Sequence, residues 1–234
     1  MIARQPITPA SLIVLLSVAA CAGKAAPVSS PTRPAAQAES SEARALRGAF
    51  KGKLHRFPDR VRFRGTVALV TPDRLYLDLS GPVGGVRAIM ATRGSRVTLL
   101  LPRTRQFLDE PATPAIYKAL LGAPLETRGL IELILSADPA ASAPGAPPRR
   151  IDLEADPGGA ARWLVVSREG ELLRAHVASE SGAEVSWGLE LRLEGIERPA
   201  PEAIPENLFD AKPGPGWTRL DPAASDVGAL LFLS

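Results

Sequence analysis

Apolar and polar residues alternate along most of the chain from Ala49 onward, which is the pattern of β-strands with one buried face. The alternation is clearest at 185–194, where every second residue is valine, tryptophan or leucine. A shift of one residue in the pairing of that strand would expose all these apolar side chains, so its register should be fixed. The other segments with this period are 50–54, 61–69, 75–79, 86–90, 97–101, 151–153, 163–166 and 172–177. Short turns separate most of them, so we expect antiparallel strands that bury one face.

The period changes between residues 111 and 136, where apolar residues recur at helical spacing. Thr113 can cap a first helix with Pro114 at its first position, and Gly122 can end it. A second helix should begin near Thr127. The apolar residues of the two helices are Ile116, Tyr117, Leu120, Leu121, Leu130, Ile131, Ile134 and Leu135. Two short helices in a chain of strands need an apolar surface to cover, and we expect them on the concave face of the sheet.

The N-terminus has the three-part layout of a secretory signal. One positive charge, Arg4, is followed by the mostly apolar residues 10–18 and by the small residues Ala19 and Ala20. The apolar part is too short to cross a hydrocarbon layer of roughly 30 Å as a helix, which takes about 20 residues. We therefore expect residues 1–20 to be removed as a signal peptide.

The single cysteine of the chain, Cys21, comes directly after these small residues. The stretch Val18-Ala19-Ala20-Cys21 resembles the lipobox of bacterial lipoproteins, with valine where that motif usually has leucine. The resemblance implies that the signal is cut before Cys21, which then carries covalent lipid, and several acyl chains anchor a protein stably. Ala22 follows where an aspartate would favour retention in the inner membrane, so the outer membrane is the expected location. The alternative is a secreted protein with a chance cysteine at this position.

Composition divides the rest of the chain into three parts. Residues 21–40 hold Cys21 and a Pro, Ala and Ser segment that cannot bury enough surface to fold, so we expect a flexible tether. A short helix is expected at 40–46, and Ile204, Leu208 and Phe209 should form a last edge element. One domain should occupy 41–220, with a mobile Pro- and Ala-rich loop at 137–149. A C-terminal tail with an apolar end follows at 221–234.

Residues that could carry chemistry are few. The only histidines, His55 and His176, both fall on the polar side of a strand, so we expect no transition-metal site. The chain has no Gly-x-Ser-x-Gly motif, and lipidation of Cys21 leaves no free thiol, so an enzyme is the less favoured hypothesis. With Arg4 removed, 27 Lys and Arg face 25 Asp and Glu, a balance of +2 that does not suggest a nucleic-acid partner. The covalent lipid on Cys21 is the one prosthetic group expected, with no cofactor besides it.

The chain resembles the LolA/LolB lipoprotein-carrier family. The residues that carry the resemblance are Gly52-Lys53-Leu54, Pro72-Asp73-Arg74-Leu75, Gly81-Pro82-Val83-Gly84, Leu121-Gly122-Ala123-Pro124-Leu125 and the apolar run 130–135. The resemblance covers about 46–135 by motif and the remainder to Phe209 by strand pattern alone. It implies a mainly β fold with short helices, in which a curved antiparallel sheet forms an unclosed half-barrel covered by a two-helix lid.

The family also implies a function. A lipid anchor marks the LolB type, an outer-membrane lipoprotein on the periplasmic face that binds acyl chains of lipoproteins or lipids and assists their insertion without catalysis. The expected partners are membrane lipid, lipoprotein acyl chains and a periplasmic LolA-like carrier, with no nucleic acid and a monomeric chain. By the resemblance, Val83 stands nearest to the apolar loop residue that delivers cargo to the membrane. The rival hypothesis is a lipoprotein scaffold of an envelope assembly that uses the same fold and carries no lipid.

The apolar strand faces supply candidates for a cavity between sheet and lid. The residues expected to line it are Phe63, Val67, Leu75, Leu77, Leu99, Trp187, Leu189 and Leu191. The residues expected to form the lid are Ile116, Leu120, Leu130 and Ile134. Most apolar strand faces form filled, dry cores, so the same residues are compatible with a core that holds no cavity.

Overall fold

The computed structural model describes residues 43–56, 59–80, 85–141, 146–153, 161–179 and 187–222. Contacts along the chain divide it into Met1–Ser41 and Glu42–Ser234, and every described residue belongs to the second unit. The expected signal peptide, the lipidated Cys21, the tether, Val83 and the apolar end of the tail lie outside the described residues.

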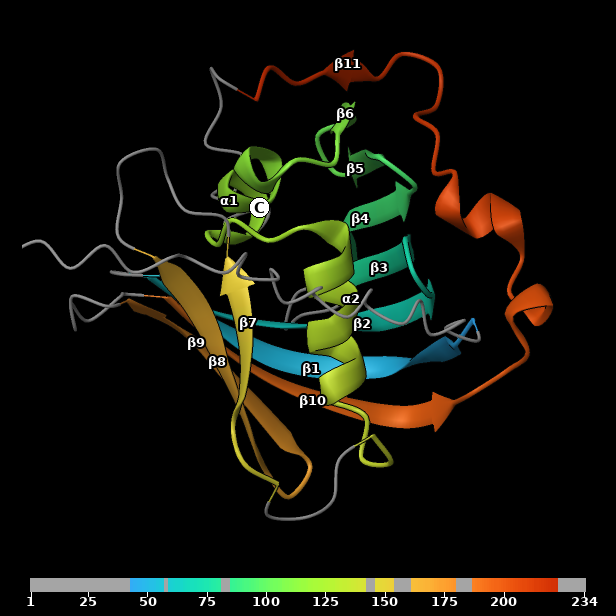
Figure 1. Cartoon of the computed structure of the whole chain (residues 1–234). Helices are drawn as coiled ribbons and strands as arrows, with labels where there is room; N and C mark the ends of the chain where they lie inside the picture. The colour runs from blue at the N-terminus through green and yellow to red at the C-terminus, as the bar shows by residue number, and fades with distance from the viewer. Residues whose placement is uncertain are drawn as a thin grey trace, which may run out of the picture. The chain divides into compact units, whose positions relative to one another are not determined.

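The described part of the chain forms one sheet of eleven strands (Figure 1). The strands are β1 (Ala45–Arg56), β2 (Asp59–Val70), β3 (Arg74–Ser80), β4 (Val86–Arg93), β5 (Arg96–Leu101), β6 (Gln106–Pro111), β7 (Arg149–Leu153), β8 (Arg162–Glu169), β9 (Leu172–Ser179), β10 (Trp187–Glu197) and β11 (Thr218–Arg219). Their order across the sheet is β11-β6-β5-β4-β3-β2-β1-β10-β9-β8-β7. Neighbouring strands are antiparallel, and the short β11 alone runs parallel to its neighbour β6.

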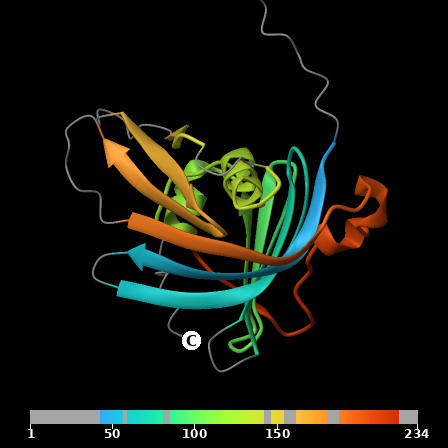
Figure 2. The same cartoon turned by 90° about the horizontal axis from the view of Figure 1, so that it is seen from below.

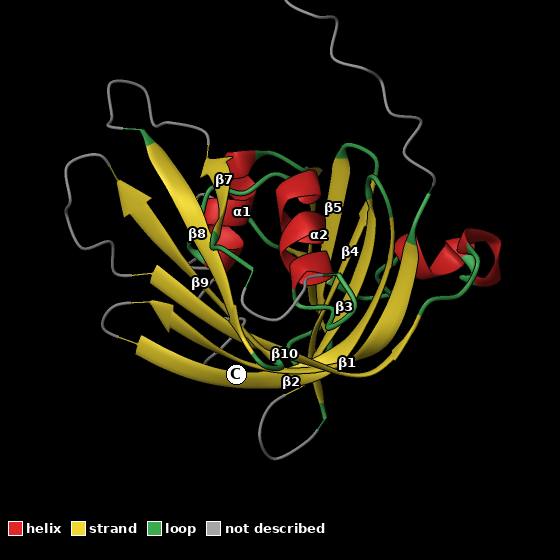
Figure 3. Ribbon diagram, turned by 60° about the horizontal axis from the view of Figure 1, so that its bottom comes forward, coloured by secondary structure: helices red, strands yellow, loops and turns green. Residues whose placement is uncertain are grey.

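The sheet curves strongly, and both helices lie within its concave side (Figures 2 and 3). Strands β11 and β7 are its two edges, so the barrel is left unclosed. The chain carries α1 and α2 between β6 and β7, which places them across the open side. The predicted fold class, an unclosed antiparallel half-barrel with a helical lid, is confirmed.

The curvature of β1 and β2 depends on glycines that face inward. In the register of this hairpin, Gly52 lies opposite Phe63, and Phe50 lies opposite Gly65. A Cβ atom on Gly52 would lie 2.4 Å from the Phe63 ring, and one on Gly65 would lie 1.7 Å from the carbonyl oxygen of Asp78. The two rings meet edge to face, with their centroids 5.9 Å apart. Each ring therefore covers the glycine opposite it, which is how aromatic residues compensate for glycine in a bent sheet.

The two helices begin and end where the sequence predicts. Helix α1 (Pro114–Leu121) has Thr113 as its cap, whose Oγ1 accepts a hydrogen bond from the Ile116 N–H, and it ends at Gly122 with φ 82°. A positive φ at the end of a helix is most easily adopted by glycine. Helix α2 (Thr127–Ser136) buries most of its apolar side chains and lies in front of β1 and β2 in Figure 1.

Two predictions of secondary structure are wrong. Ala45 and Leu46 open β1 instead of ending a short helix, because Leu46 pairs with Leu69 and is fully buried in the core. The segment expected to form an edge strand near Leu208 forms two 3₁₀ turns, η1 (Pro201–Ala203) and η2 (Glu206–Phe209). Proline lacks the N–H that a strand needs for pairing, and Pro201 and Pro205 start these turns. The turns pack a second apolar cluster onto the convex side of the sheet.

Candidate functional site

An apolar cavity of about 80 Å³ lies between the concave face of the sheet and the helices. Its wall on the sheet is formed by Phe50, Leu54, Phe63, Val67, Leu77, Leu79, Met90, Leu99, Trp187, Leu189, Leu191 and Leu193. Its wall on the helical side is formed by Leu121, Leu125, Leu130, Leu133 and Ile134. The sheet residues come from β1 to β5 and from β10, so both ends of the chain contribute to one cavity.

The cavity offers nothing to which water can hydrogen-bond. Among its lining side chains only Trp187 has a polar atom, and its indole N–H donates to the carbonyl oxygen of Leu121 at 2.7 Å. A buried water molecule needs two to four polar partners, and apolar cavities without them stay empty of water. The hydrogen bond also ties the start of β10 to the end of α1. The site is therefore a dry apolar space, and the one polar group of its lining side chains is satisfied within the protein.

Keeping this space unfilled has a cost. In proteins, a cavity left in an apolar core destabilises the fold by roughly 24 cal/mol per Å³. For a cavity of about 80 Å³ the cost is on the order of 2 kcal/mol. A larger side chain at one lining position would remove that cost.

Part of the cavity wall is reached by solvent. Phe63, Leu77, Leu79, Leu121 and Leu189 line the cavity but are only half-buried. Large apolar side chains of this kind are normally buried when neighbours are available to cover them. Together they form an apolar entrance on the inner side of the half-barrel.

The structure brings together most of the residues that the sequence suggested for the cavity. Of the eight wall candidates, only Leu75 is absent from the lining, because it is fully buried at the far end of β3 opposite Leu69. Leu130 and Ile134 of α2 line the cavity as expected of a lid. Ile116 and Leu120 of α1 pack into the core without reaching it. The lid over the cavity is thus α2 with the end of α1.

Other lining residues were not among the candidates. Phe50 and Leu54 were placed on the inward face by their alternation, and Leu79 and Leu193 continue the inward series of strands whose other members were chosen. Helical spacing could have found Leu121, and Leu133 lies one turn from candidate Leu130. Met90 ends the alternating series 86–90, whereas nothing in the pattern singles out Leu125. Lipid binding by any of these residues remains a prediction.

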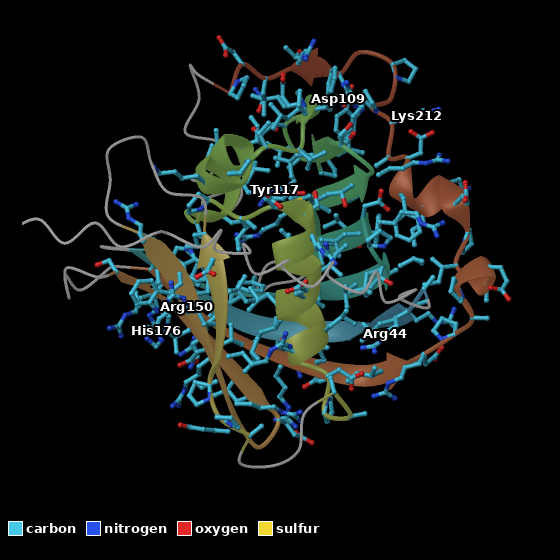
Figure 4. The ribbon with its side chains drawn as sticks, viewed as in Figure 1. Arg44, Asp109, Tyr117, Arg150, His176 and Lys212 are labelled. Atoms are coloured by element: carbon cyan, nitrogen blue, oxygen red, sulfur yellow. The ribbon has the colours of Figure 1, made fainter. Side chains whose placement is uncertain are left out.

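Helix α2 is held at both ends. At its start, the hydroxyl groups of Tyr117 and Thr127 are 2.7 Å apart in the core, and Tyr117 lies between α1 and α2 in Figure 4. Burial raises the pKa of Tyr117 to about 12, so the phenol stays neutral at physiological pH. Beyond its end, the buried Asp138 carboxylate accepts from both Nε and Nη2 of Arg198, and Arg168 donates to the Asp138 carbonyl oxygen.

This anchoring bears on the loop expected to be mobile at 137–149. Its first residues are described, and the Asp138 contacts fix them against β8 and the segment after β10. Residues 142–145 lie outside the described part of the chain.

Metal-binding groups do not gather in the described residues. No group of three or more His, Cys, Asp or Glu that could hold a metal ion occurs among them. His55 and His176 both lie opposite Gly188 on the outer face, away from the cavity, and His176 is seen beyond β7 in Figure 4. None of the described helices is long and apolar enough to span a membrane.

These features define a class: a half-barrel with a dry apolar cavity beneath a helical lid. No family model and no curated protein sequence matches the chain. Among solved structures, it is similar to an uncharacterised conserved protein from Thermus thermophilus at 12% identity, over 75% of this chain and 89% of that chain, with a TM-score of 0.34. It is also similar to a domain from Vibrio parahaemolyticus named for outer membrane lipoprotein sorting, at 9% identity over 71% and 89%, with a TM-score of 0.35. Likenesses this distant carry no functional argument, so the proposal below depends on the cavity.

Proposed function

We propose that this protein shelters the acyl chains of lipoproteins or lipids in the cavity beneath α2 and assists their localisation or insertion at the outer membrane, without catalysis. The observation that supports this function is a dry cavity whose lining side chains are all apolar apart from one indole N–H that is bonded within the protein. Metabolites with several polar groups would lose their hydrogen bonds on entering it. An alkyl chain has none to lose.

The free energy of exposing an acyl chain to water is large enough to require a protein shelter. Exposing a sixteen-carbon chain to water costs on the order of 12 kcal/mol, at about 0.8 kcal/mol per methylene group. A volume of about 80 Å³ holds roughly five to eight groups of water size, which is fewer than sixteen carbons. A whole chain therefore requires α2 to shift away from the sheet or the chain to extend through the apolar entrance at Phe63 and Leu189.

The location in this proposal comes from the sequence. Lipid on Cys21 would hold the domain at the periplasmic face of the outer membrane by a tether. A fixed acceptor of this kind needs a donor, for which a soluble LolA-like carrier is suited, and membrane lipid as the destination. We infer a monomer, because the cavity is built within one chain.

A matched pair of substitutions tests the cavity. Leu189→Trp should fill the entrance and reduce the binding of a fluorescent sixteen-carbon fatty acid at least tenfold, because the new ring occupies the space of the chain. The control is Leu208→Trp, at a half-buried leucine of the convex cluster, which should bind normally. Titration of the probe with Glu42–Ser234, which forms a unit of its own, measures both. Absence of probe binding to the unmodified chain would favour the scaffold hypothesis.

The anchor has a separate test. Cys21→Ala removes the lipidated atom and should leave the domain folded, while the protein moves from the membrane to the soluble periplasmic fraction. Cell fractionation followed by immunoblotting measures the shift. A variant that still fractionates with membranes after its signal peptide has been replaced by a cleavable secretory signal would show that Cys21 is not the anchor.

A further inference from the structure

The outer face of β1 is charged differently on its two sides. Toward β10, its cations meet carboxylates: Arg47 pairs with Glu197, Lys51 with Glu194 and Lys53 with Glu190, the last at 2.7 Å. Lys51 lies directly opposite Arg192 in this register, but its ammonium reaches the Glu194 carboxylate at 3.0 Å. These bonds form a ladder across the junction of the two strands. Opposite charges on neighbouring strands stabilise a sheet.

Toward β2, the same face places two lysines directly opposite arginines. In the register of β1 and β2, Lys51 lies opposite Arg64, Lys53 opposite Arg62, and His55 opposite Arg60. Like charges directly opposite each other destabilise a sheet. Because the β10 side shows that this chain can place acids beside β1, the fold itself does not require the repulsion. A local rule broken without a structural gain points to a function.

The arginines of β2 find no carboxylate among the described residues. Arg60, Arg62 and Arg64 are exposed, and within the described part of the chain no ion pair forms with any of them. Two described acids on this face are engaged elsewhere: Glu190 is hydrogen-bonded to Lys53, which lowers the pKa of its carboxyl, and Asp78 of β3 accepts from the Ser80 hydroxyl. The charge of the three arginines is available to a partner outside this part of the chain.

The strands also form an open hollow of about 490 Å³ on this face. Five cations border it, namely Lys51, Lys53, Arg62, Arg64 and Arg192, and Glu190 is the single carboxylate among its described lining residues. The whole chain carries only +3, so the clustering is local and does not follow from composition. Arginine forks match phosphate oxygens, and three arginines at every second residue of one strand span about 13 Å along the outer face of β2.

We propose that this basic face, made of Lys51, Lys53, Arg60, Arg62 and Arg64, docks onto the phosphate groups of an anionic phospholipid surface. A membrane fits better than a nucleic acid, because single strands are held by exposed aromatic side chains. Among the described residues that line the hollow, the one aromatic residue is Phe63, which turns its ring inward over Gly52. The proposal concerns the convex side and does not depend on an occupant in the cavity.

Vesicle sedimentation with Glu42–Ser234 tests it at low ionic strength. Vesicles of equal parts phosphatidylglycerol and phosphatidylcholine should bind the protein, vesicles of phosphatidylcholine should not, and added salt should release it. Each arginine near an anionic surface contributes about fivefold, so Arg60→Gln, Arg62→Gln and Arg64→Gln together should weaken binding on the order of 100-fold. The matched control removes three paired arginines by Arg93→Gln, Arg96→Gln and Arg219→Gln, and it should change binding less than about fivefold.

A single charge reversal separates docking from folding. Arg62→Glu places a carboxylate opposite Lys53, so the melting temperature should hold or rise while binding to anionic vesicles falls at least fivefold. The cavity variant Leu189→Trp should bind vesicles as the unmodified chain does. Equal binding to neutral vesicles, equal loss in the control variant, displacement by free inorganic phosphate at constant ionic strength, or equal affinity for duplex DNA would overturn the proposal.

Discussion

Two apolar clusters lie on opposite faces of the same strands, and they are packed differently. On the convex side, Ala45, Ala68 and Val70 leave a shallow surface that Ile204 and Phe209 cover, with Phe209 only 2% exposed. On the concave side, leucine and phenylalanine side chains surround an unfilled cavity. The convex cover is fastened by Glu206, which pairs with Arg74 and Arg93, and the Arg74 guanidinium lies 5.8 Å from the centre of the Phe209 ring.

This difference in packing indicates that the curvature of the sheet does not by itself produce the cavity. On the convex side, the small residues Ala45 and Ala68 of the sheet are covered by the aromatic ring of Phe209, and this cluster is filled. Beneath α2, the chain places large side chains that do not meet. The unfilled space therefore results from the side chains that line the cavity, which supports the proposed binding of an acyl chain.

Removing the Phe209 ring from the convex cluster should have the largest effect on stability. Phe209→Ala should lower the free energy of unfolding by about 3–5 kcal/mol, because a fully buried ring is lost from a site that cannot collapse. The same change on the concave side, Phe63→Ala, should cost roughly half as much, since that ring is half-buried beside existing space. Urea denaturation measures both. Equal losses would mean that the two clusters are packed alike.

Alkaline pH should separate the two sides next. Tyr117 beneath the lid has a pKa raised to about 12, whereas Tyr76 of the convex cluster is half-buried and its pKa is raised by burial and by Asp78. A raised pKa means that the neutral form is favoured in the folded state, so its stability is present below pH 10 and is lost as pH rises through 12. The loss from Tyr117 should reach about 2–3 kcal/mol, at roughly 1.36 kcal/mol per pKa unit.

Stability measured from pH 9 to pH 12 checks this prediction. Tyr117→Phe should be less stable at neutral pH by about 1 kcal/mol, through loss of the hydrogen bond with Thr127, yet should lose much less on going to alkaline pH. If the variant and the unmodified chain decline in parallel, another group causes the alkaline transition.

The smallest expected effect comes from adding one methylene group to a valine of β2. It separates the two sides most clearly, because the free energy of unfolding should rise on the concave side and fall on the convex side. Val67 faces the cavity and Val70 faces the convex cluster, and both are buried in β2. Val67→Leu adds a methylene group to empty space and should raise the free energy of unfolding by up to about 1 kcal/mol while weakening fatty-acid binding. Val70→Leu overpacks a filled cluster and should lower it by about 1–3 kcal/mol. Losses of equal size at both positions would show that the cavity is too narrow to accept a methylene group.

Much of this architecture could be predicted from the sequence because it depends on periodicity. A period of two fixes which side chains share a face, so Leu77, Leu189 and Leu191 were assigned correctly to the inner side. The cap at Thr113 and the stop at Gly122 fixed α1 for a similarly local reason.

The rest depends on distances that no local pattern contains. Leu75 and Leu77 share a strand and a face, yet only Leu77 lies beneath the lid. Ile116 and Leu120 have the spacing of a lid helix, but the turn between the helices sets α1 to one side. The convex arginines could be assigned to the polar face, whereas their opposition to lysines follows only from the register of β1 with β2. The cavity itself arises from gaps between side chains.

The pairing of β1 with β10 has a consequence for how the protein is made. Leu54 meets Leu189 and Gly52 meets Leu191 across more than a hundred residues of chain, and β10 supplies four residues of the cavity wall. Contacts of such long sequence separation form slowly and late in folding. A chain that crosses a membrane from its N-terminus delivers β10 among its last segments. Under the export that we propose, the cavity is completed only after nearly the whole protein has crossed, so the proposed acyl chain cannot be loaded earlier.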